Sequence, residues 1–97
     1  MAMKVKQIVL EIVNHDVTFE PTPDTYGDYV GQMAQGNIAD GAHNFVMRSV
    51  TEDGKPYLRE LDDQNPGAMM QIAGLLMAEY APQIAISVKK STASLQA

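Results

Sequence analysis

Hydrophobic and polar positions alternate along residues 5–13, and this period of two, with several β-branched side chains, predicts a strand. One face of the segment is fully apolar: Ile8, Leu10 and Ile12. The other face carries Val9 and Val13 and is partly apolar as well. The polar residues 14–16 predict a three-residue turn, and residues 17–19 resume the alternation, so the chain is expected to open with a β-hairpin.

After the hairpin the apolar spacing changes to three and four residues, which predicts helices. Thr22 is a favourable N-cap and Pro23 a favourable first helical residue, so the first helix should begin there and end at Gly36. A second helix is predicted to begin near Asp40, and a short third helix spans residues 56–61. The apolar residues expected to face the core from these helices are Tyr26, Tyr29, Val30, Met33, Ala42, Phe45, Val46, Val50, Leu58 and Leu61.

The last predicted helix is apolar on nearly every side. Asn65 is its expected N-cap, Pro66 its first residue and Pro82 its end, with Gln71 and Glu79 as the strongly polar interruptions. One stripe is expected in the core: Met69, Ile72, Ala73, Leu76 and Tyr80. A second set extends toward the other faces: Ala68, Met70, Leu75, Met77 and Ala78. A helix that is apolar all round has to be covered, so this set predicts an oligomer or a bound partner.

Residues 84–88 alternate again and predict a final strand beside the hairpin, and residues 91–97 predict a flexible tail. Residues 1–90 are therefore expected to form one α+β domain. Its predicted architecture is an N-terminal β-hairpin, three to four short helices and a C-terminal strand that completes a small, mainly antiparallel sheet.

Charge and composition exclude several classes of function. A net charge of −5 with seven scattered basic residues argues against nucleic-acid binding, which needs clustered Lys and Arg. The absence of cysteine excludes disulfides and thiolate chemistry. No apolar run reaches the roughly twenty residues of a membrane span, and the N-terminus does not read as a signal peptide. We therefore expect a cytoplasmic protein that binds neither membrane nor nucleic acid.

Candidate chemistry centres on the two histidines and their carboxylate neighbours. His15 is interpreted as a solvated turn residue. Asp40 and His43 share a helix face, so the carboxylate could orient the imidazole, but the sequence offers no companion nucleophile or second metal ligand. A structural contact of His43 is the favoured interpretation. Arg48 either joins two helices or pairs with an acidic partner, and we expect no catalytic residue, metal or cofactor.

Several segments resemble phage tail assembly chaperones: the opening hairpin with FEPT, the central AHNFVMRSV, the PGAMMQIAGLLMAEYAP helix and the final alternating strand. The resemblance covers roughly residues 6–88. It implies a non-enzymatic protein that coats the long, helical tape measure protein, keeps it soluble and recruits major tail protein subunits. It further implies a location in the host cytoplasm, absence from the mature virion, and in many members a longer frameshifted form. Lys89-Lys90 is the expected place for such a frameshift.

Methionine adapts to irregular partners, so the helical methionines are candidates for the partner surface. The predicted contacts are Phe45, Met47, Met70, Leu75 and Met77, in a protein that also forms a homo-oligomer. One alternative is a structural virion component, such as a tail-completion or head–tail connector protein. Another is a small enzyme or metal-binding domain centred on Asp40, His43 and Asp62.

Overall fold

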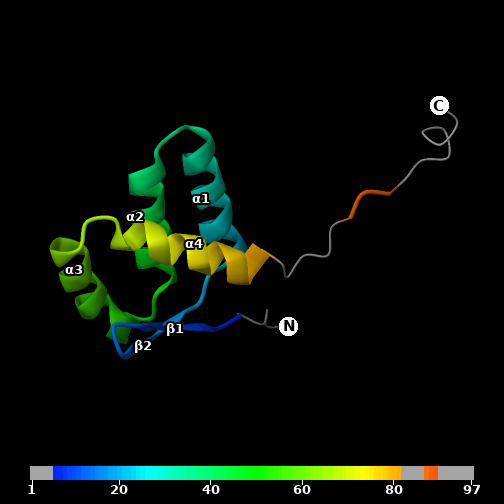
Figure 1. Cartoon of the computed structure of the whole chain (residues 1–97). Helices are drawn as coiled ribbons and strands as arrows, with labels where there is room; N and C mark the ends of the chain where they lie inside the picture. Colours follow the sequence, from blue (N-terminus) through cyan, green and yellow to red (C-terminus); the bar gives the residue numbers. More distant parts are fainter. Residues whose placement is uncertain (1–5, 82–86, 90–97) are drawn as a thin grey trace, which may run out of the picture.

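The computed structural model describes residues 6–81 and 87–89. Its elements follow in the order β1 (Ile8–Ile12), β2 (His15–Phe19), α1 (Pro23–Ala34), α2 (Ile38–Ser49), the 3₁₀ turn η1 (Glu52–Gly54), α3 (Lys55–Gln64) and α4 (Ala68–Tyr80). The hairpin lies beneath the helices, and the beginning of β1 lies near the end of α4 (Figure 1). Lys6 Nζ joins these two places by donating a hydrogen bond to the Glu79 carbonyl at 3.0 Å. The α+β class, with an N-terminal hairpin and several helices, is confirmed.

The hairpin is present, but its turn differs from the predicted one. β1 and β2 pair antiparallel with Ile12 opposite His15, so the connection is the two-residue turn Val13-Asn14. Both turn residues have positive φ angles, 48° and 67°, as a type I′ turn requires. The prediction of a turn at residues 14–16 was wrong. It relied on the polar character of these residues, whereas a tight hairpin selects its turn residues by the backbone twist that matches the two strands. His15 belongs to β2, where its ring stacks on Tyr57 with centroids 4.3 Å apart.

The outer edge of β2 contacts the segment that follows α2. Phe19 forms an antiparallel bridge with Val50, and the Thr51 N–H donates to the Thr18 carbonyl at 3.0 Å. The expected third strand over residues 84–88 is not seen in the residues that the structure describes. Residues 84–86 lie outside the described residues, while Ser87 and Val88 are described and lie in no strand. The expected tail at residues 91–97 also lies outside the described residues.

The start of α1 was correctly predicted from Thr22 and Pro23. Thr22 Oγ1 accepts a hydrogen bond from the Thr25 N–H at 3.2 Å, and Thr25 Oγ1 accepts one from the Thr22 N–H at 2.9 Å. These two bonds form a capping box that satisfies two otherwise unpaired backbone donors. Tyr29 was predicted to face the core and is buried. Val30 was also predicted to face the core but is 46% exposed, whereas Thr25, which was not predicted to do so, is buried.

The other helix boundaries differ from the predictions by a few residues. α2 begins at Ile38, ahead of the predicted Asp40, and α3 extends beyond the predicted residues 56–61 at both ends. α4 begins at Ala68, so Asn65 and Pro66 do not start it. Asn65 instead closes α3, where its N–H and its side-chain amide both donate to the Leu61 carbonyl.

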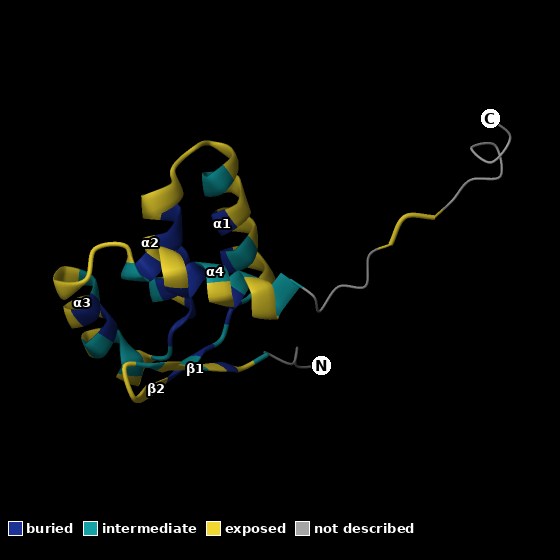
Figure 2. Ribbon diagram, viewed as in Figure 1, coloured by how far each residue is buried: buried dark blue, intermediate teal, exposed yellow. Residues whose placement is uncertain are grey.

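The core forms around α2, which packs against both α1 and α4. Phe45 of α2 stacks on Tyr29 of α1 with centroids 4.6 Å apart, and Tyr26 lies between Phe45 and Tyr80 of α4. Buried residues gather where these helices and the hairpin meet (Figure 2). The fully buried large side chains include Phe19, Phe45, Val46, Leu58 and Leu76. One core therefore joins hairpin and helices.

Candidate partner-binding surface

α4 has two unlike sides. The side toward the core carries Met69, Ile72, Ala73 and Leu76, all at most 5% exposed. On the opposite side Met70 is 46% exposed and Leu75 is 58% exposed, with the exposed Ala78 one turn further on. Gly74 lies between them, and no atom lies within 4 Å of the position its Cβ would take. The outer side of α4, where Figure 2 shows exposed positions, thus carries apolar residues on which another helix could pack closely.

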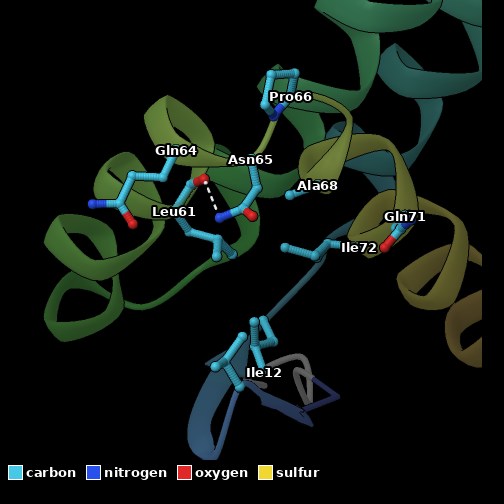
Figure 3. A pocket seen from close by; sticks show the side chains of 9 residues that line it. Ile12, Leu61, Gln64, Asn65, Pro66, Ala68, Gln71 and Ile72 are labelled. Atoms are coloured by element: carbon cyan, nitrogen blue, oxygen red, sulfur yellow. Dashed lines mark hydrogen bonds between the residues drawn. The ribbon is translucent and has the colours of Figure 1, made fainter.

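A cleft of about 410 Å³ opens at the beginning of α4 (Figure 3). Three elements meet there, with Ile12 from the end of β1, Leu61 from α3, and Ala68 and Ile72 from α4. Its polar lining consists of the amides Gln64, Asn65 and Gln71. An apolar floor with amides around it suits an apolar side chain of a partner, whose backbone the amides could bond. Sequence reasoning missed this cleft, because its lining residues come from three separate elements.

A second hollow, of about 350 Å³, lies further along the same helix. Leu75 and Glu79 of α4 line it together with residues 6–10 of the β1 segment. Gln71 lines the first cleft and Leu75 follows one turn later, so the two hollows share one flank of α4. The outer side of α4 and the first cleft form what we call the α4 surface, made of Met70, Gln71, Gly74, Leu75 and Ala78 with the lining of that cleft.

The structure separates the five predicted contact residues into three groups. Phe45 is 1% exposed and is held in the aromatic cluster, so it serves the core and not the surface. Met47 and Met77 are half-buried and pack against the core. Met70 and Leu75 are the exposed members, and both belong to the α4 surface.

His43 lies at a contact between α2 and α3. His43 Nδ1 lies 3.4 Å from Asp62 Oδ2 of α3, and both side chains are partly exposed. Asp40 lines a hollow with these two residues and Met70, so the expected neighbours do come together. Within the residues that the structure describes, however, no group of three His, Cys, Asp or Glu side chains could hold a metal ion.

Arg48 joins α2 to α1, because its Nη1 donates to Asp28 Oδ2 at 2.6 Å. This contact decides between the two roles left open for Arg48 in favour of a link between helices. Nearby, burial and, to a smaller extent, Tyr26 raise the pKa of the Tyr29 hydroxyl above its ordinary value, consistent with its place in the core. In the described part of the chain, no helix is long and apolar enough to cross a membrane.

Comparisons with known proteins bear on both function and fold. A family profile described as phage tail assembly chaperone matches residues 8–90. A comparison with curated proteins gave no match. Among solved structures, the uncharacterised protein rbstp2171 from Bacillus stearothermophilus is similar, with a TM-score of 0.66 and 18% sequence identity. That likeness covers 89% of this chain and 90% of the other, and at this identity it concerns the fold alone.

Proposed function

The chain belongs to the phage tail assembly chaperone family, and we propose that it binds the tape measure protein of its phage, keeps it soluble and recruits tail tube subunits. The role is one of binding and release, without catalysis. The observation that carries the proposal is the α4 surface. Met70 and Leu75 stand exposed there on a helix whose other side is fully buried.

The chemistry of the α4 surface suits a long helical partner. Gly74 allows close approach of a second helix, while the flexible Met70 side chain adapts to successive, non-identical contact sites. The cleft at Leu61 and Ile72 then receives one apolar side chain of the partner. A net charge of −5 keeps the chaperone and its cargo in solution.

Co-expression with the tape measure protein of the same gene cluster tests the proposal. We expect a soluble complex after affinity pull-down, with several chaperone copies for each tape measure chain. Met70→Ser and Leu75→Ser should each reduce the tape measure retained. The matched control is Val30→Ser on α1, because Val30 is as exposed as Met70, at 46%.

Three results would count against this function. Tape measure protein could stay insoluble and alone when the chaperone is present. The Val30→Ser control could reduce retention as much as the α4 variants do. Finally, mass spectrometry of finished particles could find the protein there, which would favour a structural virion component, whereas a chaperone acts in the host cytoplasm and is absent from the virion.

A longer frameshifted form is a separate part of the proposal. Lys89-Lys90 can be encoded by an A-rich slippery run close to the end of the matched residues 8–90. The nucleotide sequence tests it directly, since an interrupted A-run at these codons excludes slippage there. Mass spectrometry of the expressed gene products would show the longer chain.

A further inference from the structure

The outer edge of β1 is unpaired in the part of the chain that the structure describes. β2 is the one strand beside β1 there, and the other edge of β2 contacts the residues after α2. Natural proteins commonly protect such an edge with proline or with an inward-pointing charge. β1 reads IVLEI and has neither device, because its single charge, Glu11, points outward.

The hydrogen-bonding groups of Val9 point to this open edge. Val9 lies opposite Thr18 in the hairpin register, and the Thr18 carbonyl accepts its bond from Thr51 on the far side of β2. Opposite residues of an antiparallel pair alternate between bonded and non-bonded pairs. Val9 and Thr18 are therefore a non-bonded pair, and the N–H and C=O of Val9 are directed away from β2.

The side chains at this edge are apolar and exposed. Val9 is 57% exposed on the outer face of the hairpin. On the inner side Ile8 and Leu10 line a hollow next to α4. A strand added at this edge would bond the backbone of Val9 and cover the Val9 side chain on the outer face.

From these observations we propose that β1 pairs antiparallel with β1 of a second copy of this chain, about a two-fold axis at Val9. The hairpins of the two copies then form one four-stranded sheet. In this register Val9 lies opposite Val9 of the second copy, Ile8 opposite Leu10 and Gln7 opposite Glu11. The apolar inner faces stay on one side, and a carboxylate meets an amide.

The sequence of β1 selects this register over its neighbours. An axis at Leu10 would place each Val9 opposite a Glu11 of the second copy. An axis at Glu11 would place two like charges directly opposite each other, which destabilises a strand pair. The interface is isologous, since the same edge serves both copies. It lies on the hairpin and does not depend on tape measure binding by α4, so the two proposals can fail separately.

Single cysteines test the register, because the natural chain contains none. Opposite residues of a bonded antiparallel pair have Cα atoms about 5.5 Å apart, within the range of a disulfide. Val9→Cys should therefore give a disulfide-linked dimer under mild oxidation. Val13→Cys is the matched control, because Val13 is 70% exposed on the same hairpin. In the proposed dimer the two Val13 positions are about 27 Å apart, at about 3.4 Å per residue.

Light scattering on the full-length protein gives the independent measurement. The unmodified protein should have twice the monomer mass, and Val9→Lys should weaken dimerisation about tenfold or more while leaving the circular dichroism spectrum unchanged. Val9→Thr keeps β-branching in the strand and replaces Val9→Lys as the test variant if Val9→Lys does not fold. A monomeric unmodified protein overturns the proposal. Equal cross-linking of the Val9→Cys and Val13→Cys variants does so too, since it would reflect random collision.

Discussion

Phe45 and Leu75 provide a sharp test of which apolar residues hold the fold and which remain for a partner. Phe45 is 1% exposed and stacks on Tyr29, whereas Leu75 is 58% exposed. Truncating a buried phenylalanine to alanine costs about 3–5 kcal/mol. About two-fifths of Leu75 is covered, and complete burial of leucine is worth about 1.5–3 kcal/mol, so Leu75→Ala should cost about 0.6–1.2 kcal/mol.

These free energies translate into well-separated melting temperatures. In a domain of this size 1 kcal/mol shifts Tm by about 4–8 °C. Phe45→Ala should therefore lower Tm by about 12–40 °C, and Leu75→Ala by about 2–10 °C, in thermal unfolding followed by circular dichroism. In the pull-down the order of the two effects reverses, and Leu75→Ala becomes the more harmful change. Folded Phe45→Ala protein, assayed well below its Tm, should still retain tape measure protein. If Phe45→Ala melts like the unmodified protein, the placement of Phe45 in the core is wrong.

Three further predictions address glycine, charge and pH. Gly74→Ala should stabilise α4 by about 0.5–1 kcal/mol, while Gly41→Ala should destabilise the protein, since the new Cβ would lie 2.7 Å from a side-chain carbon of α1; thermal unfolding compares the two. A double-mutant cycle on Arg48 and Asp28 should give about 0.2–1 kcal/mol, falling with added salt, because both side chains are substantially exposed. Because burial raises the folded-state pKa of Tyr29, its contribution is fully present below about pH 10 and is lost as the pH rises further; Tyr29→Phe should lessen this loss in an alkaline unfolding titration.

Two agreeing local signals correctly predicted the start of α1 but failed at the start of α4. Thr22 as N-cap and Pro23 as first helical residue point to the same boundary, and α1 begins there. Asn65-Pro66 carries the same pair of signals but does not start α4. Gly67 adopts a left-handed φ of 92°, which turns the chain once more before the helix, and Asn65 bonds back to α3. An Asn between two helices can close one or open the other, and local sequence does not decide between them.

Helical periodicity predicted which α4 residues are buried and which are exposed, but it did not predict contacts between separate elements. Period arguments on α4 separated Met69 and Ile72, which are buried, from Met70 and Leu75, which are exposed. The same arguments did not determine which neighbour covers Phe45, since α2 packs against helices on two sides. The cleft at the beginning of α4 depends on long-range placement of β1 and α3, which a single sequence does not encode in any local pattern.

The α4 surface of one copy is too small to hold a partner tightly by itself. Completing the burial of Met70 and Leu75, which are 46% and 58% exposed, is worth about 1.6–3 kcal/mol in total. Association alone costs about 4–15 kcal/mol, so even with the cleft filled a single contact should be weak and easily displaced. Linking two such surfaces makes the second contact intramolecular and can raise avidity about 10²–10⁴-fold.

If both proposals hold, the dimer through β1 therefore strengthens tape measure binding through a residue that touches no tape measure. The disulfide-linked Val9→Cys dimer should retain more tape measure protein than Val9→Lys, at equal chain concentration in the pull-down. The α4 residues Met70 and Leu75 are present in both variants, so a difference in retention reports the number of linked surfaces. Equal retention by the two variants would show that each α4 surface acts alone. The cleft at the beginning of α4 would then have to contribute far more to the binding free energy than its volume of about 410 Å³ suggests.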